Sequence, residues 1–408
     1  MCIVYCVYST YTLSPFYNVM KKVFIAAILF LLVACSQRDC REGLPVISVN
    51  ELLKSGETIN LSKYASDIEY IPLETNAESV IMANSVKSNG LNFYVSAIGH
   101  SNDVARFSAD GKYIGRIGKR GRGPGEYTFL EHYGIVRDVK GVGGRNRIFV
   151  AGHNKTVIYD GNGAVGEIIS ESRIDDLECL NDNRYAFLLG HIGENNEVLQ
   201  KIVVTDSLGR ELHEIEAGNT SVTSLDMGGR SIQTRQRNFI YSFGDSLRLV
   251  NAAVDTLFAV QENVKKPLLS LCWDNWKGNL PNGNFIFETE SFIMIPVSFP
   301  TSLFADYFKN IVVPEKSSSA KIVFDKREKR ATPLLHDSKY RLMYGFKNDI
   351  DDGAPFLPSY SDGKKMYQIV QAAHFKEVAN LGNSAKMKAV AAQLTEESNP
   401  VLIVVTLK

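Results

Sequence analysis

Short apolar runs separated by turn residues dominate the chain from residue 68 onward. The runs are rich in β-branched and aromatic residues, and each is too short for a buried helix, so the pattern predicts strands. The chain is therefore expected to be all-β. Examples of such runs are residues 68–73, 92–95, 147–150, 202–205 and 321–324.

Turn residues join several of these runs into predicted hairpins. Asp110 and Gly111 lie between two strand-like runs, and the segments 157–165 and 203–212 repeat this plan. Asp, Asn and Gly favour such positions because tight hairpin turns need a positive φ. Further hairpins are expected between 247–250 and 255–258, and with a turn at 325–329.

The first three hairpins align by a glycine near each turn. Gly111, Gly163 and Gly209 are 52 and 46 residues apart, and an isoleucine follows each glycine six positions later. A period near 50 residues with several strands per unit is typical of propeller blades. The length of the body divided by this period predicts a six-bladed β-propeller, with seven blades as the alternative.

A region near the C-terminus departs from the β pattern. Apolar residues recur at helical spacing between 384 and 397, with Asn383 or Ser384 available as the N-cap. A short helix around 372–379 is expected to precede it. Both segments predict a small helical insertion in the last blade, packed on the outside or at one end of the propeller.

The apolar segment 401–407 follows this insertion and has no local partner. We expect it to pair with a strand near 68–73 from the start of the body. Such pairing would close the ring of blades and remove an open sheet edge.

The N-terminal segment has the features of an export signal. Two lysines follow Met20 and precede an apolar run that ends in LVAC at 32–35. This arrangement is typical of a bacterial lipoprotein signal peptide, and the run is too short for a spanning helix. We expect Met20 to be the true start, with an N-terminally extended signal as the alternative. In both cases everything before Cys35 is removed, and Cys35 carries lipid.

These features divide the chain into three predicted parts. Residues 1–34 form the signal region, residues 35–55 form a polar tether, and residues 56–408 form the propeller. The predicted location is the bacterial cell envelope, with the body tethered to the outer membrane through its N-terminal lipid.

The net charge of the processed chain limits the classes of partner that it can bind. Removal of residues 1–34 from 408 leaves 374 residues, and the loss of two lysines from 45 basic and 45 acidic residues leaves a formal charge of −2. This near-neutral balance argues against nucleic acid as a partner.

The three cysteines after Cys35 are far apart. Cys40, Cys179 and Cys272 lack metal-binding spacing. Two of them could form a disulfide in the envelope, and otherwise Cys179 and Cys272 are expected to be buried thiols.

One segment resembles a known repeat. GKRGRGPGEY at 118–127 is similar to the glycine-rich opening of an NHL-type repeat, and the chain follows that repeat as far as Asp160. The whole body resembles the bacterial six-bladed β-propeller lipoproteins, a mostly uncharacterised family. The resemblance covers 56–408 and implies a fold, with no activity to transfer. It is carried by IEYIPLET at 68–75, NDIDDGAPF at 348–356 and NPVL at 399–402.

Two groups of residues are candidates for ligand binding. The glycine-rich loop could hold an anion through its N–H groups and Arg120 or Arg122, although it lacks a Walker pattern. The alternative is that its glycines make the crossover between two blades. Trp273 and Trp276 could stack on sugar rings, and the alternative is that they pack a blade.

Metal and catalytic signals are weaker. Asp349, Asp351 and Asp352 precede Gly353, but the spacing fails that of a calcium loop and fits a turn. The seven histidines show no zinc or nucleophile motif, so no cofactor and no metal site is predicted. His132, His153 and His191 lie between predicted strands and could point into a central channel.

The sequence therefore predicts an envelope lipoprotein whose propeller binds or scaffolds a protein or glycan partner. Loops from all blades meet on one rigid face, which suits recognition. The alternative is a propeller hydrolase, lyase or lactonase that acts on carbohydrate in the channel. Fold alone does not separate the two, and we expect binding without catalysis.

Overall fold

The computed structural model describes the chain from residue 44 onward, in segments. Cys35, Cys40 and Trp276 lie outside these described residues. The segments are 44–52, 57–97, 103–136, 147–161, 163–180, 184–193, 197–226, 231–235, 238–273, 286–298, 319–334, 337–340 and 345–408.

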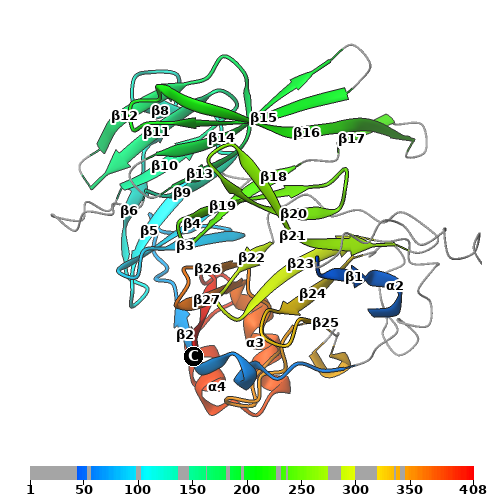
Figure 1. Ribbon diagram of the computed structural model, residues 1–408. Coiled ribbons are helices and arrows are strands. Elements are labelled where there is room, and N and C mark those ends of the chain that lie inside the picture. Colours follow the sequence, from blue (N-terminus) through cyan, green and yellow to red (C-terminus); the bar gives the residue numbers. More distant parts are fainter. Residues whose placement is uncertain are drawn as a thin grey trace, which may run out of the picture. The chain divides into compact units, whose positions relative to one another are not determined.

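The body is a six-bladed β-propeller, as the sequence predicts, and each blade is an antiparallel sheet whose first strand lies innermost (Figure 1). Blade 1 contains β3 (Ser85–Ser88), β4 (Asn92–Ser96), β5 (Val104–Ser108) and β6 (Tyr113–Ile117). Blade 2 contains β9 (His132–Val136), β10 (Arg147–Ala151), β11 (Lys155–Asp160) and β12 (Gly163–Ile169). Blade 3 contains β13 (Arg173–Cys179), β14 (Tyr185–Ile192), β15 (Glu197–Thr205) and β16 (Glu211–Asp226), with β17 (Ser231–Arg235) added at its edge.

The remaining blades follow the same plan. Blade 4 contains β18 (Phe239–Phe243), β19 (Ser246–Asn251), β20 (Thr256–Gln261) and β21 (Val264–Cys272). Blade 5 contains β22 (Phe287–Glu288), β23 (Phe292–Ser298), β24 (Ser319–Asp325) and β25 (Arg330–Pro333). Blade 6 contains β26 (Tyr360–Ser361), β27 (Lys365–Val370), β28 (Val401–Leu407) and β2 (Ala65–Pro72).

The two ends of the chain's body meet in blade 6, which confirms the predicted closure. β2 pairs with β28 in antiparallel fashion from Ala65 opposite Leu407 to Pro72 opposite Val401, and the C-terminus lies beside β2 (Figure 1). β28 also pairs with β27 on its other side. One sheet therefore holds strands from both ends of the described sequence.

The up-and-down order of the strands within each blade gives the propeller two distinct faces. Because each blade starts at the channel, the blade-to-blade connections and the loops between second and third strands lie where the inner strands begin. We call this end the connector face. The turns between first and second strands and between third and fourth strands lie at the opposite end, which we call the hairpin face.

The turns between third and fourth strands explain the periodic signal. In blades 1, 2 and 3 they lie at or beside Gly111, Gly163 and Gly209, all with positive φ. In blades 4 and 5 the same turn holds Glu262 at φ 51° and Lys329 at φ 52°. Positive φ therefore recurs at this turn even where glycine does not.

Two details of the predicted repeat are wrong. The hairpin between 247–250 and 255–258 exists, but it joins the second and third strands of blade 4 and is out of phase with the others. The predicted isoleucine position is also wrong in blade 2. Ile169, six positions after Gly163, is 73% exposed, and the buried isoleucine is its neighbour Ile168. A one-residue shift in a strand exchanges the faces of its side chains.

The helical insertion lies between β27 and β28, as predicted. It comprises α3 (Ala372–Leu381) and α4 (Ala385–Ala391), with Ser384 as N-cap accepting a hydrogen bond from the Met387 N–H. The second and third strands meet at the connector face, so the insertion belongs to that end of blade 6. In the described part of the chain, none of the helices has the length and apolar character needed to cross a membrane.

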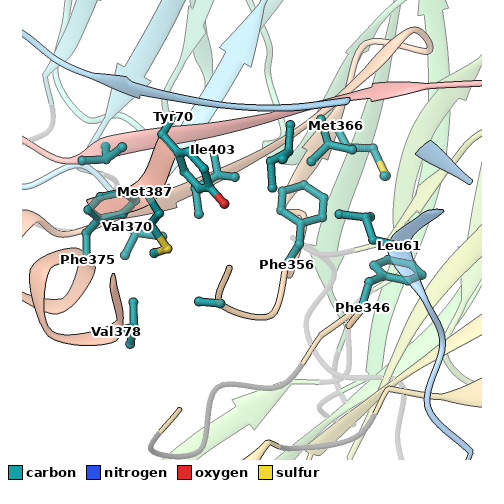
Figure 2. Packing of buried hydrophobic residues seen from close by; sticks show 14 of the residues in the cluster. Leu61, Tyr70, Phe346, Phe356, Met366, Val370, Phe375, Val378, Met387 and Ile403 are labelled. Carbon is teal, nitrogen blue, oxygen red and sulfur yellow. The ribbon is translucent and has the colours of Figure 1, made fainter. Parts of the chain in front are cut away.

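Apolar clusters fill the spaces between neighbouring blades. The cluster in Figure 2 joins blades 5 and 6 to the insertion, and its members Phe356 and Phe375 are fully buried. Tyr70 packs edge-on against Phe375, with 5.6 Å between ring centroids. Truncating one such phenylalanine to alanine costs about 3–5 kcal/mol, so the helices form part of the core.

The acidic turn at 349–352 has a structural role. Ser62 donates to Asp349 from its N–H at 2.9 Å and its hydroxyl at 2.6 Å, which holds a 3₁₀ turn (Leu61–Lys63) in place. Asp351 accepts from Asn348 at 2.7 Å and from the Tyr70 hydroxyl at 3.1 Å. Protein groups therefore satisfy these carboxylates, in keeping with the turn interpretation.

A short strand before the propeller proper was not predicted. β1 (Val46–Ser48) pairs in parallel with the last residues of β21 on the outer edge of blade 4, and α2 (Val49–Leu52) follows it against β25. We call residues 45–52 the strap. The part of the predicted tether that the structure describes thus includes a strand on the propeller's rim.

Candidate functional site

A hollow lies in the central channel of the propeller. Its volume is about 370 Å³, and the inner strands β3, β9, β13, β18, β22 and β26 of all six blades line it. Ionisable side chains are concentrated here, in contrast to the apolar interfaces between blades. The acidic and basic lining residues, together with the lining histidine, are Lys87, Glu131, His132, Asp176, Glu178 and Glu288.

Asp176 and His132 form a pair across blades 2 and 3. The His132 Nδ1 lies 3.4 Å from the Asp176 Oδ1, and both side chains are largely buried. Burial raises the pKa of Asp176 to about 6, although hydrogen bonds from the Ile240 and Leu177 amides and the nearby charge of Lys87 oppose this rise. The carboxyl group therefore titrates close to neutral pH.

Carboxylates on β13 also join blade 3 to blade 4. The Asp176 Oδ2 accepts from the Ile240 N–H at 2.9 Å, and the Glu178 Oε2 accepts from the Ser242 hydroxyl at 2.9 Å. Asp176 and Glu178 are two residues apart on β13, so their side chains lie on the same face of the strand, and both contact β18 along the channel wall. These bonds fix the positions of both acids relative to the neighbouring blade.

Glu288 is the most buried acid of the channel wall. Its side chain is 4% exposed, and it binds Arg248 Nε at 2.8 Å and Lys326 Nζ at 2.7 Å. The Tyr241 hydroxyl donates to it at 3.2 Å. Burial raises the pKa of Tyr241 well above its usual value, with the Glu288 charge adding to the effect. This cluster joins blades 4 and 5.

Lys87 of blade 1 and Tyr360 of blade 6 lie together on another part of the wall. The Lys87 Nζ is 4.7 Å from the centroid of the Tyr360 ring, which is a cation–π distance. The Tyr360 ring stacks on Tyr367, and its hydroxyl donates to the Ser88 carbonyl at 3.3 Å. Blades 6 and 1 thus present an aromatic ring and an ammonium group to the channel.

The connector face carries a second polar cluster at the edge of the channel. Glu131, which lines the channel, lies 2.8 Å from His153 Nδ1 and 3.6 Å from Arg173 Nη2. His153 also tilts against Phe129, with 5.5 Å between ring centroids. Phe129 is 46% exposed, so this cluster offers an aromatic face to solvent.

Arg120 lies beside this cluster. The Arg120 guanidinium is 5.7 Å from the centroid of the Phe129 ring, and its Nε donates to the Thr128 carbonyl at 3.2 Å. Arg120 and Arg122 are both exposed in the connection between blades 1 and 2. Their connector-face position leaves them accessible to a partner, outside the channel itself.

Acidic side chains already occupy N–H groups of the glycine-rich loop. The Gly123 N–H donates to the Glu126 carboxylate at 2.9 Å, and the Gly125 N–H donates to Glu167. At Gly121 a Cβ atom would lie 1.9 Å from the Glu126 carboxylate, so a larger residue there would require the Glu126 side chain to move. The protein's own carboxylates thus take the place that an external anion would have.

The predicted tryptophan pair is not brought together by the described structure. Trp273 is 3% exposed, packs between blades 4 and 5, and donates its Nε1–H to Asp255 at 3.2 Å. It leaves no ring face open for stacking on a sugar. Trp276 lies outside the described residues.

The three candidate histidines lie in different places. His132 lines the channel, and His153 lies at its edge on the connector face. His191 lines a separate hollow of about 320 Å³ on blade 3, together with Leu199 and Lys201. In the part of the chain that the structure describes, no group of three or more His, Cys, Asp or Glu residues could hold a metal ion.

Sequence reasoning missed most of the channel wall. Lys87, Asp176, Glu178 and Glu288 come from three blades, and no local motif unites them. The usable signal was a group of ionisable residues within an inner strand, as in RIDDLEC at 173–179. Cys179 is buried, as expected, whereas Cys272 is only partly buried, contrary to expectation.

Comparisons with known proteins were informative for the fold. No curated protein matches the chain. A solved structure from Bacteroides fragilis, described as a candidate exported protein, is similar with a TM-score of 0.62 and 16% identity over 90% of this chain and 99% of that chain. A member of the DUF4221 family from Bacteroides vulgatus is similar with a TM-score of 0.41 and 10% identity over 84% of this chain and 97% of that chain, too distant to carry an argument.

The family match covers the propeller and the strap together. A family model matches residues 44–406, which is nearly the whole described body. The resemblance to NHL-type repeats stays a prediction. The chain belongs to the family described as "Domain of unknown function (DUF4934)".

Proposed function

We propose that this protein is an envelope lipoprotein whose propeller binds a glycan in the central channel. The observation that carries this proposal is the channel of about 370 Å³, whose wall presents carboxylates, an ammonium group and tyrosine rings. Pockets of this size hold small ligands, and sugars are recognised by such polar groups together with aromatic faces. A protein partner is the other outcome of the test.

Lipidation at Cys35 and tethering to the outer membrane complete the proposal. The support is the lysine-led apolar run that ends in LVAC at 32–35. Labelling with palmitate should occur in the wild type and be absent from Cys35→Ser. Equal labelling of both proteins would contradict lipidation at Cys35 and would leave the proposed glycan site unaffected.

A glycan array with purified Cys35→Ser protein tests the binding function. Binding should weaken in Tyr360→Ala and in Lys87→Met, because both side chains line the channel. Arg122→Ala is the matched control, since its side chain is exposed outside the channel. Loss of binding in Arg122→Ala alone would place the ligand on the glycine-rich loop. An array without hits, with capture of a protein partner instead, would overturn the glycan assignment.

A hydrolase, lyase or lactonase acting in the channel is the second candidate. It is favoured by one observation: Asp176 lies 3.4 Å from His132 and has its pKa raised to about 6 by burial. A carboxyl group that titrates near neutral pH is suited to general acid–base chemistry. Turnover of a carbohydrate or lactone by the wild type, abolished in His132→Gln, would support this candidate over simple binding.

A further inference from the structure

The strap fixes the point from which the chain leaves the propeller toward its N-terminus. Val46, Ile47 and Ser48 pair with residues 270–272 of β21, and the Ser270 N–H donates to the Pro45 carbonyl at 3.0 Å. β21 is the outermost strand of blade 4, so the chain leaves from the outer rim and not from the channel. Blade 1, at three steps in the ring of six, lies on the opposite side.

Burial shows that the strap is firmly docked. Ile47 is 4% exposed and Val49 is fully buried, and both belong to the apolar cluster between blades 4 and 5. Removing apolar side chains of this kind from water favours the docked position. Farther along, Lys63 binds Asp325 of blade 5 at 2.9 Å. The chain is therefore held at both ends of the segment that leads to β2.

Docking of the strap shortens the reach between Cys35 and the propeller. An extended chain spans at most about 3.5 Å per residue, so the ten steps from Cys35 to Pro45 reach about 35 Å. Without the strap the first fixed residue would be Ile59, whose carbonyl accepts from the Lys347 N–H at 2.8 Å, and the twenty-four steps from Cys35 would reach about 85 Å. A compact body of this length has a radius of gyration of about 20 Å, so only the shorter reach restricts orientation.

From this geometry we infer that the rim of blade 4 is the membrane-facing surface of the propeller. The inference rests on the lipid anchor of the proposed function, and it does not depend on the ligand. The rim suits a lipid surface, because the exposed Lys266 lies on β21 and Val264 is 67% exposed at the strand's start. Blade 1 then faces away from the bilayer, and both ends of the channel open to the side.

Energy transfer from a labelled cysteine to acceptor lipids tests this orientation. Lipidated full-length protein with Cys40→Ser and Cys272→Ser is labelled at Lys266→Cys in blade 4 or at Ile114→Cys in blade 1. Both positions are exposed on fourth strands, so they are matched. In vesicles containing acceptor lipid, position 266 should lose more donor fluorescence than position 114. Equal loss, or a larger loss at position 114, would overturn the inference.

Two further variants separate orientation from anchoring. Cys35→Ser should fail to bind vesicles. If it bound as well as the wild type, the proposed lipidation at Cys35 would be wrong, but the labels would still report the orientation of the propeller. Ile47→Asp combined with Val49→Asp should release the strap, lengthen the reach and equalise the two positions. A difference that survived strap release would mean that something other than the strap orients the propeller.

Discussion

At the scale of single residues, buried carboxylates hold neighbouring blades together. Glu288 binds cations from blades 4 and 5, and Asp325 binds Lys63 and the Tyr64 hydroxyl from the segment before β2. Asp176 and Glu178 join blade 3 to blade 4. Because charges are costly to bury without partners, the loss of one member leaves its partners uncompensated.

Glu288→Ala is expected to destabilise the propeller strongly. The substitution leaves Arg248, whose side chain is 10% exposed, without the partner that it binds at 2.8 Å. Breaking a buried ion pair in this way costs about 3–5 kcal/mol. Urea unfolding measures the effect, and Glu290→Ala, an exposed position two residues away, is the control. A Glu288→Ala protein as stable as the control would show that the cluster contributes little.

Asp325→Asn is expected to remove a pH-dependent contribution to stability. Burial opposes ionisation of Asp325, but hydrogen bonds from the Glu328 amide, Lys63 and Tyr64 outweigh it and lower its pKa to about 2. A lowered pKa stabilises the fold above the ordinary value of 3.8, and this stabilisation is lost as pH falls toward about 2.

The variant should therefore be less stable than wild type by about 1–3 kcal/mol at pH 7, and the difference should shrink in acid. Unfolding free energies measured from neutral pH downward provide the check. Asp110→Asn alters an exposed carboxylate at the corresponding turn of blade 1 and should have a smaller effect. A difference that stayed constant with pH would contradict the assigned role of the charge.

At the scale of elements, local chemistry decides how much the sequence can predict. The hairpins at Gly111 and Gly209 were predictable, because a residue with positive φ marks a tight turn. The pair α3 and α4 was predictable from helical spacing and a capping serine. The phase of the blade 4 hairpin was not predictable, because Asp255 also has positive φ and marks another turn of that blade.

Elements that depend on distant partners escaped prediction. β1 has three residues, and its partner strand begins more than 200 positions later. The channel wall combines Lys87 with Asp176 and Glu288, which only ring closure brings together. The candidate residues that could be named from local motifs, Arg120 and Trp273, lie outside the channel.

Ser384→Ala is expected to weaken the helical insertion. The Ser384 hydroxyl accepts from the Met387 N–H at 3.0 Å and donates to Asp351, so it caps α4 and ties it to the acidic turn. Loss of an N-cap costs about 0.5–2 kcal/mol. Thermal unfolding should show a lower midpoint than for Asn383→Ala, which changes the adjacent exposed residue. Equal midpoints would exclude Ser384 as the effective cap.

At the scale of the whole molecule, ring closure depends on β28. This strand pairs with β2 on one side and β27 on the other, so it links the two ends of the body. Deletion of residues 400–408 should unfold the entire propeller, because it opens the ring and exposes two sheet edges. Circular dichroism on heating measures this, and deletion of Lys408 alone is the control. Melting like the full-length protein would contradict closure through blade 6.

Hydrogen exchange of the glycan-bound protein tests the central claim, that the ligand binds in the channel. With saturating glycan from the array, the amides of β3, β9 and β13 should exchange more slowly than in the free protein, because these inner strands form the wall. The outer strands β6 and β12 should be unchanged. Slower exchange confined to outer strands, or to α3 and α4, would contradict a channel site.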